Sequence, residues 1–215
     1  MSRLPFISTA ACLLLCLAST AHAEDHDGKG LRLRAWTGAV GRYVLTDNEQ
    51  FDSGSDGMTS MSIDSSTYSV GIGAEYKFFR WLGVEGSVAY MRPHVTFQSS
   101  VDTAPERAGY TVFPAFLSLN VHPITNKYVD LWFGPQIAYV SYPDDLTFHP
   151  MGAPAFQYKS ENSFSAVGFT VGADVNLDPT WALNFAFRFQ DSDGDADGQL
   201  TYDPTLITAG LTAKM

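Results

Sequence analysis

The feature that most constrains how this chain folds is an alternation of apolar with polar or small residues at every second position. It recurs in eight runs, which span residues 31–45, 67–79, 81–97, 110–122, 128–142, 163–177, 180–191 and 204–215. A period of two is that of a β-strand, whose successive side chains point to opposite faces. Outside the N-terminal region, no stretch is continuously apolar for long enough to form a transmembrane helix. The pattern therefore predicts an all-β chain of eight strands.

The connections between these runs alternate between long and short. The long ones occupy 46–66, 98–109, 143–162 and 192–203, and the short ones lie around Phe79-Arg80, Pro123–Lys127 and Asp178-Pro179. A soluble β-sandwich also alternates along its strands. An even number of long strands, with tight turns on one side and long loops on the other, is instead typical of an outer-membrane barrel. We expect an eight-stranded antiparallel transmembrane up-and-down β-barrel.

The first 23 residues have the features of a secretory signal peptide. Arg3 precedes a short apolar run, and Ala21-His22-Ala23 fits the small-x-small rule for cleavage after Ala23. Residues 24–215 are then the barrel. The two cysteines, Cys12 and Cys16, both lie before this cleavage position, so the barrel has no cysteine chemistry. A lipoprotein signal at Cys16 is the alternative, but Leu15 stands where such signals have a small residue.

Composition narrows the class of protein further. Aromatic residues make up 13% of the chain and the mean hydropathy is close to zero, as expected for a folded chain with dispersed apolar residues. The formal net charge of −10 argues against a nucleic-acid partner, which would require a basic face. We expect a protein of the cell outer membrane. Its expected partners are membrane lipid, lipopolysaccharide and the barrel-insertion machinery.

The face opposite the apolar one carries small and charged residues, as the interior of a narrow barrel requires. Seven glycines fall on it: Gly71, Gly73, Gly83, Gly134, Gly168, Gly172 and Gly210. Aromatic residues gather near the strand ends, at Tyr76, Phe78, Phe79, Trp81, Tyr90, Tyr128, Tyr139, Tyr142 and Trp181. These positions suit the two aromatic girdles of a membrane barrel. The alternative is that they are aromatic residues of a core.

With the strands placed, five segments stand out: Ile63-Asp64-Ser65-Ser66-Thr67, the hairpin from Tyr76 to Glu85, Phe113 to Leu119, Tyr128 to Tyr139, and Asp203-Pro204. Through these segments the chain resembles the outer-membrane W (OmpW) family over nearly all of residues 24–215. The chain departs from the family at Asp130-Leu131, where Arg-Pro is usual, and at Met215, where such barrels generally end in Phe.

The resemblance implies a small barrel linked to the passage of small hydrophobic compounds across the outer membrane. It does not imply a particular substrate. The alternative is a non-transporting barrel that is structural, adhesive or a receptor for phage or bacteriocin. An uptake defect in a deletion strain favours transport, whereas loss of phage or host-surface binding with normal uptake favours the alternative.

Eight strands place both termini on one side, which we take as the periplasm. The inward positions of the periplasmic half then carry nine charged residues: Arg32, Arg34, Glu75, Lys77, Glu85, Asp130, Asp174, Arg188 and Lys214. Isolated charges in such an interior would cost several kcal/mol each. We therefore expect these residues to pair and to form a charged plug.

The inward positions of the extracellular half are mostly apolar. They are Val40, Met91, Val112, Pro114, Ala138, Val140 and Leu206. This arrangement suggests that a small apolar molecule enters from outside, meets the plug and leaves sideways into the bilayer. The alternative is a packed apolar core without a path. Replacing Met91 or Val140 by Asp is expected to slow the uptake of an apolar probe.

One acidic loop resembles part of a calcium site. Asp193, Asp195, Asp197 and Gly198 match the first half of a D-x-D-x-D-G loop, in which spaced carboxylates supply oxygen ligands. The glutamate that completes such a loop is missing, because Pro204 stands at the twelfth position. The alternative is a solvated acidic loop. No other cofactor is expected.

An enzyme of the outer membrane would need a nucleophile beside a histidine. After residue 23 the sequence holds His26, His94, His122 and His149, and none of them lies in a His-x-Ser pair. His94 and His122 adjoin prolines at strand ends, where we expect interfacial polar residues. We expect no enzymatic activity.

Overall fold

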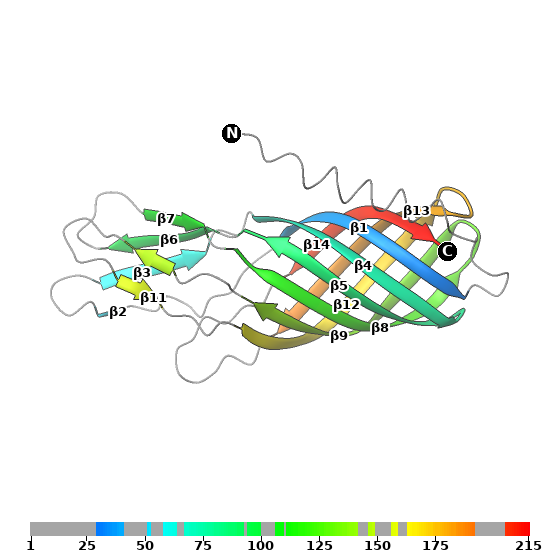
Figure 1. The fold of residues 1–215 in the computed structure, drawn as a ribbon, viewed down its shortest axis with the longest axis horizontal. Helices are drawn as coiled ribbons and strands as arrows, with labels where there is room; N and C mark the ends of the chain where they lie inside the picture. The colour runs from blue at the N-terminus through cyan, green and yellow to red at the C-terminus, as the bar shows by residue number, and fades with distance from the viewer. Residues whose placement is uncertain are drawn as a thin grey trace.

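The computed structural model describes residues 29–40, 51–52, 58–63, 67–92, 94–99, 106–109, 111–141, 146–148, 156–158, 163–191 and 205–215. Eight strands of this part of the chain form a closed antiparallel barrel in the order β1-β14-β13-β12-β9-β8-β5-β4 (Figure 1). The fold class predicted from the alternation is thereby confirmed. The signal peptide predicted at residues 1–23 lies outside the described residues.

The barrel strands coincide closely with the predicted runs. They are β1 (Gly30–Val40), β4 (Thr67–Phe79), β5 (Leu82–Met91), β8 (Phe113–Thr125), β9 (Val129–Ser141), β12 (Ser163–Asn176), β13 (Trp181–Asp191) and β14 (Leu206–Lys214). The shortest has 9 residues and the longest 14, so each is long enough to cross a hydrocarbon layer at a tilt. The first and last strands pair along Arg32–Lys214 to Val40–Leu206, and this pairing leaves the sheet without an open edge.

The two ends of the barrel differ. At one end, which we call the turn end, short connections join β4 to β5, β8 to β9 and β12 to β13. The opposite end we call the loop end, and the halves of the barrel next to them the turn half and the loop half. Beyond the loop end lie two smaller sheets (Figure 1). One has the order β2-β3-β6-β7 and the other is the β10-β11 hairpin.

These small sheets correct two expectations. Residues 81–97 were expected to form one strand, but β5 ends at Met91 and β6 (His94–Ser99) belongs to the separate sheet. Pro93 explains the break, because proline has no N–H to donate to a barrel ladder. The long connections were expected to be loops. They also contain β2 (Phe51–Asp52), β3 (Met58–Ile63), β7 (Glu106–Gly109), β10 (Leu146–Phe148) and β11 (Phe156–Tyr158).

The outer surface of the barrel is apolar. Val, Ile, Leu and Phe side chains are exposed along its strands, for example Ile72, Val88 and Ile137. The exposed charged side chains in the described residues all lie at the ends: Lys29, Arg80, Arg92, Lys127, Asp178 and Asp191. Such an apolar band is stable in contact with lipid, whereas contact with water would be unfavourable.

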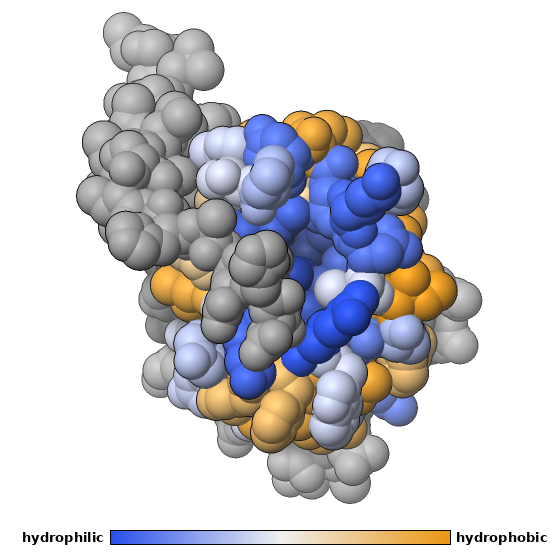
Figure 2. Space-filling model, turned by 90° about the vertical axis from the view of Figure 1, so that its right-hand side faces the viewer, coloured by the Kyte–Doolittle hydropathy of each residue, from blue (hydrophilic) through white to orange (hydrophobic). Residues whose placement is uncertain are grey.

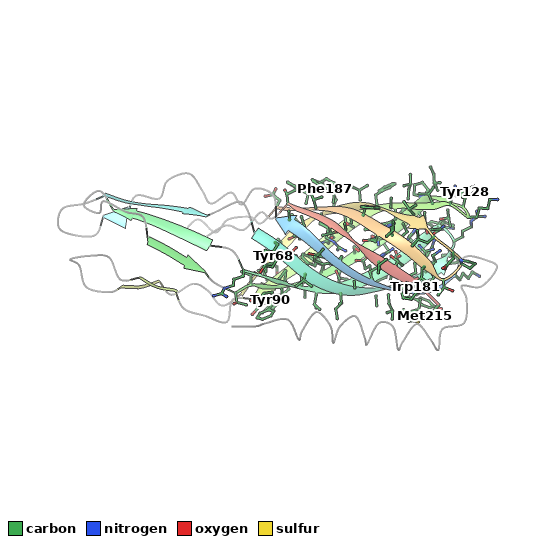
Figure 3. All side chains as sticks on the ribbon, turned by 90° about the horizontal axis from the view of Figure 1, so that it is seen from above. Tyr68, Tyr90, Tyr128, Trp181, Phe187 and Met215 are labelled. Carbon is green, nitrogen blue, oxygen red and sulfur yellow. The ribbon has the colours of Figure 1, made fainter. Side chains whose placement is uncertain are left out.

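Aromatic residues mark both ends of this apolar band. Tyr68 and Tyr90 lie toward the loop end, and Tyr128 and Trp181 toward the turn end (Figure 3). At the turn end the rings of Phe79 and Trp81 also stack, with centroids 5.7 Å apart. Aromatic residues at two heights are expected where a barrel meets two membrane interfaces. No helix in the described part of the chain is long and apolar enough to span a membrane.

Candidate functional site: the barrel interior

The turn half of the barrel encloses a charge cluster. Seven of the eight strands contribute to it, because alternation turns every second residue inward. Its members are buried: Arg32, Arg34, Glu75, Lys77, Glu85, His122, Asp130, Asp174 and Arg188. From the turn end, hydrophilic residues gather around the centre and hydrophobic residues around the outside (Figure 2).

Arg34 on β1 lies at the centre of this cluster. Its Nη1 donates to Glu85 Oε2 at 2.5 Å, and its Nη2 donates to Glu75 Oε2 at 2.7 Å and to Asp174 Oδ2 at 2.9 Å. The guanidinium also lies 4.9 Å from the ring centroid of Trp132. One cation thus joins β1 to three other strands, and each contact is a charge-assisted hydrogen bond shielded from water.

Asp130 on β9 is a second meeting point. Its Oδ2 accepts hydrogen bonds from Arg32 Nη1 at 2.5 Å and from Lys77 Nζ at 2.9 Å. Asp174 stands directly opposite it on β12, which places two carboxylates side by side. Arg32 also contacts Asp174 at 3.4 Å, so the same cation offsets the repulsion between the two carboxylates.

His122 completes the cluster and was not expected there. Its Nδ1 lies 2.8 Å from Asp130 Oδ1, and its Nε2 lies 2.9 Å from Glu75 Oε1. A neutral imidazole has one N–H, whereas the imidazolium has two. Contact of both ring nitrogens with carboxylate oxygens therefore indicates a doubly protonated ring.

The expectation that His122 is an interfacial residue is wrong. The strand was expected to end at residue 122, but β8 continues to Thr125 across a register shift between Val121 and Ile124. Pro123 lies within this shift and cannot donate to the ladder. His122 lies within this strand and not at its end, and it continues the inward face of Phe116, Ser118 and Asn120. The side chain of His94 lies outside the described part.

Arg188 links the cluster to the loop half. Its Nη2 donates to Glu85 Oε1 at 2.5 Å and its Nη1 to Gln136 Oε1 at 3.2 Å. Arg188 was expected in the turn half and Leu206 in the loop half, yet the register places them directly opposite each other. The strands of a barrel are tilted relative to its axis, so directly opposite residues on neighbouring strands lie at different levels along the axis. The position of a residue within its own strand therefore does not give its level in the barrel.

The remaining predicted lumen residues also face inward where their side chains are described. Met91, Val112, Pro114, Ala138, Val140 and Leu206 are buried in the loop half. The side chain of Val40 is outside the described residues. Lys214 is buried at the turn end, and its Nζ donates to the carbonyl of Asp178 at 3.3 Å.

Sequence reasoning missed the polar and aromatic residues of the interior. They include Trp36, Phe116, Ser118, Trp132, Gln136 and Gln190, all of which are buried. The signal was present, since these residues occupy the same alternate positions as the charged residues that were selected. The selection took charged and aliphatic residues and passed over the others on the same face.

The predicted calcium ligands Asp193, Asp195 and Asp197 lie outside the described residues. Within the described ranges, no group of three or more His, Cys, Asp or Glu side chains is arranged to hold a metal ion. The carboxylates of the charge cluster are instead bonded to Arg, Lys, His and Asn side chains.

A closed barrel with an apolar exterior and a charged, hydrogen-bonded interior is the architecture of an integral outer-membrane protein. A family model described as "Outer membrane protein beta-barrel domain" matches residues 8–214. The chain therefore belongs to this family, and its place is the outer membrane. No curated protein matches the chain.

Several solved structures are similar to it. The outer membrane protein OprG from Pseudomonas aeruginosa has a TM-score of 0.61 and 17% identity, with 90% of this chain and 99% of that chain covered. Neisserial surface protein A (NspA) has a TM-score of 0.55 and 13% identity, covering 86% and 97% of the two chains. For the E. coli outer membrane protein W the TM-score is 0.47 and the identity 15%, over 88% and 100% of the chains. These identities show the barrel fold alone.

Proposed function

We propose that this barrel takes up small hydrophobic molecules at the loop end and releases them sideways into the bilayer between β5 and β8. It is then a divergent member of the outer-membrane W family, without enzymatic activity, and its loop end faces the cell exterior. The proposal depends on one feature of the wall, an interruption of the backbone ladder beside the apolar part of the lumen.

Pro114 on β8 causes this interruption. Met91 and Val112 exchange two backbone hydrogen bonds, both of 3.0 Å. In an antiparallel pair the next such position is two residues along each strand, where Ala89 lies opposite Pro114. Proline has no N–H, so the carbonyl of Ala89 lacks the bond that β8 would otherwise donate.

The surroundings of this interruption are apolar on both sides. On the inside lie Ala89, Met91 and Val112, and all are buried. On the outside, Val88 and Phe113 are exposed toward the lipid. These side chains are all apolar, so a hydrophobic molecule that passes between them desolvates no charged or polar side chain of this set.

The charge cluster supports a sideways exit over a straight one. A molecule that continued toward the turn end would have to separate Arg34 from three carboxylates. Leaving any of these groups buried without its partner would cost about 3–5 kcal/mol. An eight-stranded barrel is also too narrow for a wide aqueous pore.

A second proline serves as an internal comparison. Pro135 on β9 is at the hydrogen-bonding position opposite Leu119. The run of paired residues likewise has a gap between Ser118–Gln136 and Val121–Phe133, without a change of register. The interior at this place is polar, with Ser118 and Gln136 facing inward. Pro135 therefore removes a backbone donor as Pro114 does, but the lumen beside Pro135 is polar.

The proposal is tested by comparing Pro114→Ala with Pro135→Ala. Each substitution restores one N–H, but only the first closes the wall beside apolar side chains. Uptake of radiolabelled naphthalene is measured in a deletion strain that carries either variant at equal outer-membrane level. We expect Pro114→Ala to slow uptake several-fold and Pro135→Ala to leave it unchanged. Equal uptake in both variants and the parent contradicts the proposed exit.

An adhesive or receptor function is the second candidate. It is favoured by the sheet β2-β3-β6-β7, which lies beyond the loop end and away from the lipid-facing band (Figure 1). Loops that project from a rigid barrel commonly carry recognition. A deletion strain with normal naphthalene uptake and reduced phage or host-surface binding would support this candidate over transport.

A further inference from the structure

Two glutamine amides face the lumen above the charge cluster without a full set of hydrogen-bond partners. Gln190 on β13 is 0% exposed, and neither its Nε2 nor its Oε1 has a partner. Gln136 on β9 is also buried, and its Nε2 has no partner, although its Oε1 accepts from Arg188. A buried amide that lacks partners is destabilising, so its retention calls for a reason.

The register brings these groups into one row of the wall. Ser118, Gln136, Gly168 and Gln190 stand directly opposite one another on β8, β9, β12 and β13. The Oγ of Ser118 also lacks a partner. Gly168 has no side chain, so nothing on β12 stands between the two amides. The unpartnered groups therefore lie in one row across neighbouring strands on one side of the lumen.

Three inward positions near this row are apolar. Ala166 lies two residues from Gly168 toward the loop end, and Ala138 stands opposite Ala166. Leu206 stands opposite Arg188, two residues from Gln190. All three are buried. Polar groups of the row thus lie next to apolar side chains of the lumen.

The chemistry of the row selects an uncharged ligand head. Gln190 offers a donor and an acceptor, and Gln136 Nε2 offers a further donor. Arg188, the nearest cation in the register, is already bonded to Glu85 and Gln136. An anionic head would have to compete with Glu85 for it. A carboxamide has both the acceptor and the donor that Gln190 requires.

We propose that Gln190 and Gln136 form a binding site for the carboxamide head of a small amphipathic molecule whose chain lies against Leu206, Ala138 and Ala166. This inference rests on the proposed function, because it places the ligand in the same lumen. It adds to the proposed function one specific class of hydrophobic ligand, namely molecules with an uncharged amide head and a short apolar chain.

The test is titration calorimetry of the full barrel in lipid nanodiscs with hexanamide. We expect saturable binding that weakens at least tenfold in Gln190→Leu and several-fold in Gln136→Leu. N,N-dimethylhexanamide, which cannot donate, should bind at least tenfold more weakly to the parent. Thr208→Val is the matched control, because Thr208 is a buried lumen residue whose Oγ1 already bonds the carbonyl of Ala186 at 3.3 Å, and it should bind as the parent does.

Two results would overturn the inference: no saturable heat with hexanamide, or equal binding by the parent and both glutamine variants. In either case the two amides do not form a binding site for this ligand class. Heat-modified gel migration shows whether each variant is folded before titration. Naphthalene has no hydrogen-bonding group, so loss of the amide site leaves the Pro114→Ala result intact. A failed naphthalene test with intact hexanamide binding overturns the exit and not the site.

Discussion

The two halves of this lumen are built on the same eight strands and differ in what the inward side chains do to one another. In the turn half, cations and carboxylates from different strands bond directly, as Arg34 does with Glu75, Glu85 and Asp174. In the loop half, apolar side chains such as Val140 and Leu206 line the wall, and the amide of Gln190 has no partner. A closed barrel therefore fixes which side chains face inward, while their chemistry makes one half cross-linked and the other receptive to a ligand.

The largest effect on stability is expected from removing the central cation of the turn half, Arg34. Arg34→Met removes the bonds to three buried carboxylates and leaves them uncompensated, so the free energy of unfolding should fall by about 3–5 kcal/mol. Urea unfolding in lipid vesicles, followed by tryptophan fluorescence, measures it. The matched control is Arg80→Met at the exposed turn, where the expected loss is below about 1 kcal/mol. Equal losses in the two variants would show that the cluster is not what stabilises this half.

A smaller effect is expected at His122. His122→Gln can bond one of the two carboxylates that the imidazolium bonds, and the free energy of unfolding should fall by about 1–3 kcal/mol. The ring state is checked directly by nitrogen NMR of the parent at neutral pH, which should show both ring nitrogens protonated. A spectrum with a single protonated nitrogen contradicts the doubly donating ring in the turn half.

Val140→Asp tests whether the loop half admits an apolar molecule. A carboxylate there has no cation opposite it, because Pro114 and Phe164 are its paired neighbours. The charge should raise the barrier for an apolar molecule, and a change of about 1.4 kcal/mol would slow naphthalene uptake about tenfold. Val140→Thr, which is similar in shape and uncharged, is the control. Unchanged uptake in the Asp variant favours a packed core over a path.

The sequence predicted most of this barrel because a period of two is visible within each strand. Residues 67–79 and 163–177 were assigned as strands from their own alternation, and β4 and β12 follow these bounds almost to the residue. The same alternation predicted that Glu75 and Lys77 face inward, as they do. These are properties of one strand, and they do not depend on its neighbours.

What could not be predicted depends on how strands pair. The height of Arg188 relative to Leu206 follows from the tilt of the sheet, and the contacts of His122 with Glu75 and Asp130 follow from how β4, β8 and β9 are arranged around the barrel. Neither is encoded in the alternation of a single strand. Pro114 was expected to face inward, but the effect of its missing N–H became clear only when Ala89 was found opposite it.

The most direct test of a lateral exit is to join β5 and β8 covalently beside Pro114. Val88 and Ala115 are directly opposite and face outward, and Cys12 and Cys16 lie in the predicted signal peptide, so a Val88→Cys/Ala115→Cys pair is expected to form one defined disulfide. A Leu117→Cys/Ile137→Cys pair joins the other edge of β8 as a control. The account predicts that oxidation slows naphthalene uptake several-fold in the first pair alone and that a reductant restores it. Equal uptake by the oxidised and reduced forms of the first pair would contradict it.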